Sequence, residues 1–200
     1  EDGSLQPYFF TSFDISDDGC VLDFTWPTTA VWGDGQPVTW DDIAFTIKFL
    51  AETAKSSYFL NLVSVEETGE GKGRITFSQP DVYGWSGSAM MQGVLPKHIW
   101  EKFEGSDEYK NYTGEDAAIG CGPYKLVSKD VDAQVSYYEA IPENNYHGDI
   151  TVESVTIKTY ADATAVMAAL NAGEIDCYYA YSSPIDYTLM DMISDPAVDK

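Results

Sequence analysis

Apolar and polar residues alternate along residues 19–26, which read GCVLDFTW. Cys20, Leu22, Phe24 and Trp26 fall on one face, and the residues between them fall on the other. An alternation of period two is typical of a β-strand with one buried face. We therefore expect a half-buried strand in this part of the chain.

An amphipathic helix is predicted from about Thr39 to Lys55. Its apolar residues recur every three or four positions and form one stripe: Ile43, Ile47, Leu50, Ala51 and Ala54. Phe45 and Phe49 lie off this stripe, so a second face of the helix should also be covered.

The stretch WGDGQPVTWDD carries the signals that start this helix. Residues 33–35, Gly-Asp-Gly, predict a turn, because glycine adopts positive φ without strain and Asp tolerates it. Thr39 is suited to cap the helix, and Asp41 and Asp42 would complement the positive end of its dipole.

Two more elements and a polar segment follow. Residues 62–65 and 74–77 predict a β-hairpin across the glycine-rich tip 68–73. Pro96 should open a short helix, whose apolar residues are Ile99, Trp100 and Phe103. Residues 104–117 are polar and lack periodicity, so we expect a linker or surface loop with a subdomain boundary near its end.

The pattern changes after residue 117. Residues 123–127 and 133–138 predict two strands joined by a turn at 130–132, and residues 152–160 predict a third, with Val155 and Ile157 on one face.

A helix should follow, with Asp162 as its cap, Gly173 at its C-terminal end, and an apolar stripe of three residues: Val166, Ala169 and Leu170. Residues 175–179 predict the next strand. Strand, helix and strand with short links form a βαβ unit, so these two strands should be parallel with a right-handed crossover. The sequence thus predicts a mixed α+β fold of the α/β type.

The composition is strongly acidic. The 200 residues contain 33 acidic and 11 basic side chains, which gives a net charge of −22. Such a surface repels phosphate backbones and anionic lipid headgroups, so we expect no nucleic-acid partner and no direct membrane partner. There is no apolar run of about 18 residues that would span a membrane.

Neither the cysteines nor the chain ends show a motif. Cys20, Cys121 and Cys177 lack the spacing of a zinc or redox site, and their odd number favours free, buried thiols. The first residues, EDGS, do not resemble a signal peptide, and no closing element is evident at the end. These features suggest a piece of a longer chain.

Candidate catalytic groups are few. His98 and His147 are the only histidines, and we interpret them as a helix-start residue and a loop residue. The glycines at 69, 71 and 73 lack the dinucleotide-binding spacing, and 84–87 lacks the first glycine of a nucleophile elbow. Neither Asp17-Asp18-Gly19 nor the 33–35 turn continues as a calcium loop. Paired carboxylates for glycoside cleavage remain an alternative in so acidic a chain.

Tyrosines cluster in the second half: Tyr137, Tyr138, Tyr146, Tyr160, Tyr178, Tyr179, Tyr181 and Tyr187. Aromatic rings with a polar group suit binding surfaces, although tyrosines on a strand also serve as core residues. Ligands of open α/β sheets bind beyond the carboxyl ends of the strands, which here is 178–184. The candidate ligand contacts are therefore Tyr178, Tyr179, Tyr181, Ser182 and Ser183.

Several short motifs occur in a fixed order. The stretch WGDGQPVTWDDIAFTIKFL resembles the pattern W-x-DG-x-P-x-T-A-x-D-V-x-F-[ST], with Trp40 in place of a small residue and Ile43 in place of valine. It is preceded by SDDG at 16–19. It is followed by VLPKH (94–98, similar to I-L-P-K-H), IGCGPYK (119–125, similar to G-T-G-P-Y), PENNY (142–146, similar to N-P-x-Y-W without its tryptophan) and AALNAGEID (168–176, similar to A-L-x-x-G-E-I-D).

Together these motifs resemble the family 5 extracellular solute-binding proteins, the oligopeptide-, dipeptide- and nickel-binding components of ABC importers. The resemblance implies a fragment of a type II periplasmic-binding-protein-like fold whose second lobe is absent. Residues 1–117 would be an accessory subdomain of the first lobe, and 118–200 part of its ligand-binding portion. Asp34 and Asp42 would be structural, and Gly120, Gly122 and Pro123 would shape the return of the chain into the lobe.

The implied function is that of an extracytoplasmic receptor, periplasmic or lipid-anchored, that delivers peptides or another small solute to an ABC permease. No enzymatic activity and no cofactor are expected. Nickel complexes, haem and oligosaccharides also occur as ligands in the resembling family, but a nickel role would require histidines in the cleft. The alternatives are an extracellular glycoside-processing enzyme or carbohydrate-binding module, and a surface adhesion module.

Overall fold

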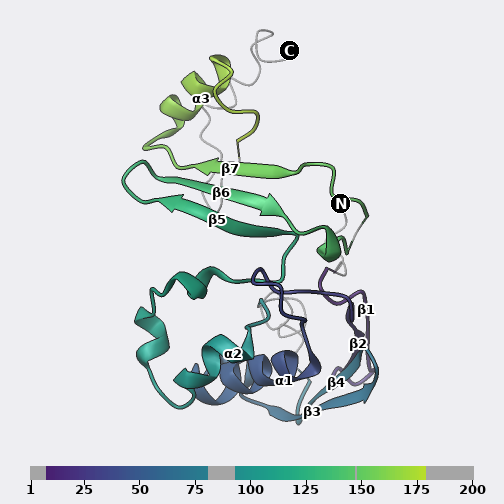
Figure 1. Cartoon of the computed structure of the whole chain (residues 1–200). Helices are drawn as coiled ribbons and strands as arrows, with labels where there is room; N and C mark the ends of the chain where they lie inside the picture. Colours follow the sequence, from purple (N-terminus) through teal and green to yellow (C-terminus); the bar gives the residue numbers. More distant parts are fainter. Residues whose placement is uncertain (1–7, 81–92, 147, 179–200) are drawn as a thin grey trace. The chain divides into compact units, whose positions relative to one another are not determined.

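A computed structural model of the 200-residue chain describes residues 8–80, 93–146 and 148–178 (Figure 1). It contains two β-sheets and three α-helices in these residues. Two compact units are distinguished: Glu1–Val127 with Tyr137–Val155, and Ser128–Ser136 with Thr156–Lys200. The assignment of residues 1–117 and 118–200 to an accessory subdomain and a ligand-binding lobe stays a prediction.

The first sheet is antiparallel, with the strand order β1-β2-β4-β3. Its strands are β1 (Ser12–Ile15), β2 (Val21–Thr25), β3 (Leu62–Gly69) and β4 (Lys72–Phe77). The predicted alternation in β2 is confirmed, because Leu22, Phe24 and Trp26 are buried. The predicted hairpin is also confirmed, but its tip is only two residues long, Glu70 and Gly71, because the strands extend to Gly69 and from Lys72.

Helix α1 (Trp40–Lys48) packs on this sheet and continues into a π-helical turn, η1 (Phe49–Thr53). Ile43 and Ile47 join the core formed by β2 and β4. The predicted second face exists, since Phe45 and Phe49 pack with Phe103 in a separate apolar cluster. The sequence predicts an α-helix to about Lys55, but after Lys48 the hydrogen-bond pattern changes to that of a π-helix.

Tyrosines from the polar segment 104–117 help to cover this second face. Tyr109 lies edge-on to Phe49, and Tyr112 packs against Trp100 and Phe103. The segment forms two 3₁₀ turns, η4 (Glu108–Asn111) and η5 (Glu115–Ala118), although its sequence shows no helical period. It is therefore a packed surface loop, and its two tyrosines are half-buried against this second apolar cluster.

Asp42 joins helix α1 to the short helix α2 (Lys97–Trp100). Its side chain is 5% exposed, and Oδ2 accepts from both the N–H (2.8 Å) and the hydroxyl (2.9 Å) of Thr39. Oδ1 accepts from the N–H of Lys97 at 2.9 Å. One turn later, the hydroxyl of Thr46 accepts from the N–H of Leu95 at 2.9 Å. Two side chains of α1 thus accept hydrogen bonds from the backbone N–H groups of Leu95 and Lys97, at the entry to α2.

The second sheet has the order β5-β6-β7. Its strands are β5 (Tyr124–Asp130), β6 (Val135–Ala140) and β7 (Ser154–Lys158), and they alternate in direction (Figure 1). The predicted hairpin of β5 and β6 is confirmed. The face of β7 that was predicted to be apolar is open, because Ile157 is 53% exposed.

Helix α3 (Ala163–Asn171) has the predicted ends. The N–H of Ala165 donates to Asp162 Oδ1 at 2.8 Å, and Gly173 has φ +71°. The N–H groups of Gly173 and Glu174 donate to the carbonyls of Leu170 and Ala169, which closes the helix in a Schellman motif.

The predicted βαβ unit needs correction. Residues 175–178 are not a strand, and Tyr179 lies outside the described residues. Cys177 and Tyr178 are exposed, whereas strands of parallel sheets are covered on both faces. The mixed helix-and-sheet fold class holds, but the described residues contain no parallel strand after α3.

Replacement of Asp42 by Ala should lower the free energy of unfolding by about 2–4 kcal/mol, because two backbone N–H groups lose a buried acceptor. Urea unfolding followed by circular dichroism measures this change. The exposed neighbour Asp41, changed to Asn, is the matched control and should cost less than about 0.5 kcal/mol. Equal losses in the two variants would contradict the role of Asp42.

A side chain at Gly73 should also destabilise the first sheet. Gly73 lies opposite Phe24, and an added Cβ would come within 2.6 Å of the Trp40 ring and closer still to Phe24. Gly73→Ala is expected to cost about 1–3 kcal/mol through overpacking. Gly69→Ala, where the nearest atom would be 3.8 Å away, serves as the control in the same hairpin.

Candidate functional site

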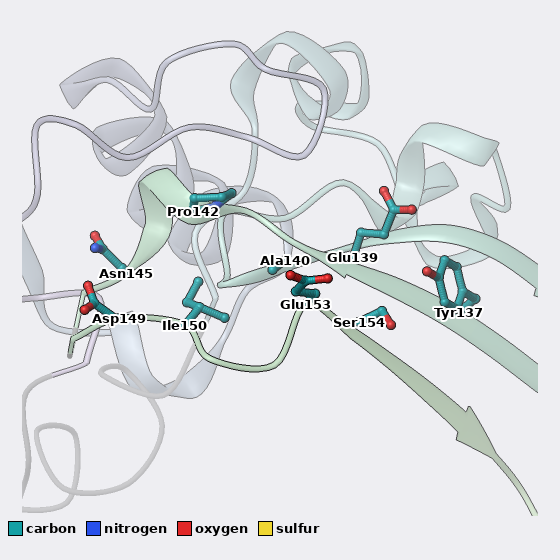
Figure 2. A pocket seen from close by; sticks show the side chains of 9 residues that line it. All are labelled: Tyr137, Glu139, Ala140, Pro142, Asn145, Asp149, Ile150, Glu153 and Ser154. Carbon is teal, nitrogen blue, oxygen red and sulfur yellow. The ribbon is translucent and has the colours of Figure 1, made fainter.

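A pocket of about 650 Å³ lies between the end of β6 and the start of β7 (Figure 2). Nine residues line it: Tyr137, Glu139, Ala140, Pro142, Asn145, Asp149, Ile150, Glu153 and Ser154. Asn145 and Asp149 lie at one end in Figure 2 and Tyr137 at the other, with Glu153 between them. The pocket is therefore elongated along the strands.

Two backbone hydrogen bonds and one from a tyrosine hydroxyl hold the walls of this pocket. The N–H of Ala140 donates to Glu153 O at 2.9 Å, and the N–H of Ile141 donates to Pro123 O at 2.8 Å. The hydroxyl of Tyr124 donates to Val152 O at 2.9 Å. The hollow is thus part of the β-sheet framework.

The pocket lining is acidic. Glu139, Asp149 and Glu153 contribute carboxylates, and none of the nine described lining residues is Lys or Arg. This lining favours positively charged groups over anions. The whole chain has three acidic residues for each basic one, so an acidic lining alone identifies no ligand. Within the described ranges, no three His, Cys, Asp or Glu side chains gather into a possible metal site.

The predicted ligand contacts do not include any residue of this pocket. Tyr178 is 42% exposed, and Tyr179, Tyr181, Ser182 and Ser183 lie outside the described residues. Their role stays a prediction. Pro142 and Asn145 lie in the PENNY motif, but that motif does not by itself indicate a pocket, which arises from the pairing of β6 with β7.

A buried junction lies next to the pocket, in the 3₁₀ turn η6 (Pro142–Asn144). Asn144 Oδ1 accepts from the N–H of Val31 at 2.9 Å. Its Nδ2 group lies 2.8 Å from Val31 O, 2.9 Å from Gly122 O and 3.1 Å from Cys121 O. One amide therefore joins three segments that are far apart in the sequence.

Two neighbouring contacts reinforce the junction. The hydroxyl of Tyr146 donates to Cys121 O at 2.6 Å, and the N–H of Gly33 donates to Gly120 O at 2.9 Å. Burial raises the pKa of the Cys121 thiol to about 12 and also raises the pKa of Tyr146. The raised pKa values keep both groups neutral at physiological pH.

The cysteines of the described residues are all free, as predicted. Only Cys121 is buried, whereas Cys20 is half-buried and Cys177 is exposed. The expectation that the thiols are buried is therefore correct for Cys121 alone.

The two motifs before residue 100 also contact each other. His98 Nε2 lies 2.9 Å from Asp34 Oδ2. Asp34 accepts as well from the backbone N–H and the side-chain amide of Gln36, both at 3.1 Å. Burial disfavours ionisation of Asp34, but these hydrogen bonds and the His98 ring hold its pKa below the ordinary 3.8. Both side chains are thus engaged within the protein.

Comparison with known families identifies the chain. The profile described as bacterial extracellular solute-binding proteins, family 5, middle region, matches residues 4–196. The chain belongs to this family. The family and its fold are those of binding proteins. The order of motifs in the sequence predicted this family correctly.

Solved structures share this fold. NikZ from Campylobacter jejuni, in complex with Ni(L-His), is 27% identical with a TM-score of 0.73; the match covers 96% of this family 5 chain and 37% of NikZ. The oligopeptide-binding protein AppA from Bacillus subtilis, in complex with a nonapeptide, is 26% identical with a TM-score of 0.71, covering 84% and 34%. CtaP from Listeria monocytogenes, an ABC transporter substrate-binding protein, is 27% identical with a TM-score of 0.68, covering 85% and 35%.

The family 5 chain is shorter than the proteins it matches. It spans 34–37% of these three structures and 26% of the first curated relatives, from Brucella. None of the helices in its described part has the length and apolar character needed to cross a membrane.

The pair of Asp34 and His98 predicts a pH dependence. Because the pKa of Asp34 is lower in the folded protein, its contribution to stability is present above the unfolded-state pKa and is lost as the pH falls through the folded-state pKa. Asp34→Asn should therefore lower the free energy of unfolding at pH 7, and this loss should shrink below about pH 4. Urea unfolding at pH 7, 5 and 3 tests it, with the exposed Asp14→Asn as the control. A loss that is equal at all three pH values would refute the assignment.

Proposed function

We propose that the protein containing this chain is an extracytoplasmic receptor of an ABC importer, with oligopeptides or dipeptides as its ligands. The family match over residues 4–196 carries this proposal, and the nonapeptide complex of AppA supports the ligand class. The receptor would close two lobes around its solute and then dock on the permease. No covalent step and no cofactor are part of the proposal.

Peptides are preferred over nickel complexes for a structural reason. A nickel site would draw on histidines, which are common metal ligands. The chain has two, and His98 is already engaged with Asp34 next to helix α2. The tyrosine- and serine-rich stretch 178–183 instead offers rings and hydroxyls, which suit peptide groups. Tyr178, Tyr179, Tyr181, Ser182 and Ser183 are our proposed ligand contacts.

Thermal shift and calorimetry on the longer protein test the ligand class, with a defined nonapeptide mixture and Ni(L-His) as the probes. At 100 times its Kd, a bound peptide should stabilise the protein by about 2.7 kcal/mol and raise the melting temperature by several degrees. Stabilisation by Ni(L-His) alone would contradict the peptide assignment. Release of reducing sugar from a glycan panel, without a peptide shift, would instead favour a glycoside-processing enzyme.

The 200 residues alone should not bind the nonapeptide measurably, because the second lobe that the family resemblance implies would supply the other wall of the cleft. Calorimetry on this chain makes the comparison with the longer protein direct. A micromolar affinity of the isolated chain would show that the complete site lies within these residues.

A further inference from the structure

The amide of Asn144 satisfies backbone groups from two separate segments at once. Its side chain is 1% exposed, and each of its polar atoms has a partner. Val31 belongs to the loop that contains the 33–35 turn, and Cys121 and Gly122 immediately precede β5. Asn144 itself lies between β6 and β7, so the amide connects the entry to β5, the exit from β6 and this distant loop.

The asparagine side chain supplies both kinds of group that this position requires. The site needs one acceptor for the N–H of Val31 and donors for the surrounding carbonyls. Aspartate has no donor and would place a negative charge against these carbonyls. Alanine would remove the partner of the Val31 N–H and of the Val31 and Gly122 carbonyls, which is the costly case, whereas Cys121 O would keep the Tyr146 hydroxyl.

The surrounding hydrogen bonds fix the backbone but do not replace the amide. The N–H of Gly33 reaches Gly120 O, and the N–H of Ile141 reaches Pro123 O. These bonds join the segments in pairs, whereas the Asn144 side chain bonds to Val31 and to 121–122 together, as no other side chain in the described hydrogen bonds does. Loss of the amide would therefore loosen the entry to β5 without breaking the neighbouring pairs.

We infer that Asn144 is a positioning residue for ligand binding: its buried amide fixes where the chain enters β5, and thereby the frame of the proposed ligand-binding lobe. This inference rests on the proposed function for its ligand-binding part. Its structural part depends only on the described contacts, so the two parts are tested by separate measurements.

Cys121 provides a local probe. Its thiol is buried and its carbonyl accepts from both Asn144 and Tyr146. In a background with Cys20→Ser and Cys177→Ser, labelling by a disulfide reagent under native conditions reports opening of the junction. The control is Phe103→Leu, a core variant in the cluster of Phe45 and Phe49, compared at equal free energy of unfolding. Relative to this control, Asn144→Ala should accelerate labelling of the Cys121 thiol at least about tenfold.

Glu143→Ala is the matched control, because Glu143 is exposed in the same turn η6 and does not line the pocket. Its labelling rate should remain within about twofold of the parent. If Asn144→Ala labels Cys121 no faster than the stability-matched core variant, the amide has no local role and the inference is refuted.

The second measurement is the affinity of the longer protein for the nonapeptide that binds it best. It is made at a temperature well below the melting temperature of each variant. Asn144→Ala should weaken binding about tenfold, and Glu143→Ala should leave it within about twofold. Unchanged affinity despite faster labelling would overturn the positioning role. If the unmodified protein binds none of the peptide probes, the proposed function fails, and the labelling experiment still decides whether Asn144 holds the junction.

Discussion

Buried backbone without regular secondary structure must find hydrogen-bond partners, and this constraint shapes the chain. Backbone partners in turns meet much of it, and two buried side chains meet it where distant segments come together. Asp42, at the start of α1, accepts the N–H of Lys97 together with both donors of Thr39. Asn144 binds backbone groups of Val31 and of residues 121–122. Each side chain is nearly inaccessible to solvent, so it meets these backbone groups away from bulk water.

Local chemistry made several elements predictable from the sequence. The alternation in β2, the Asp162 cap and Gly173 end of α3, and the two faces of α1 each follow from side chains within one element. The packed segment 104–117 could not be predicted, because Tyr109 and Tyr112 are half-buried by aromatic partners on other elements. No strand forms at 175–178, the described part of the strand that was predicted there, for a related reason: apolar residues indicate a strand only if another element covers them.

The candidate site was less predictable than the fold. The pocket beside η6 depends on how β6 pairs with β7, and its carboxylates carry no spacing that distinguishes them from the many others in this chain. The Asn144 junction was indicated only indirectly, through the motifs at 119–125 and 142–146 that supported the family resemblance. Asp34 and Asp42 have the structural roles that the resemblance implied, as a turn and a helix start.

The segment that leads into α2 shows how the constraint acts on one residue type. Leu95 and Lys97 each present an N–H to a side chain of α1, and the fully buried residue between them is Pro96. Proline alone has no backbone N–H. Any other amino acid at position 96 would carry an additional donor into this buried contact. The imino acid in the VLPKH motif therefore avoids a hydrogen-bonding requirement that the neighbouring helix would otherwise have to meet.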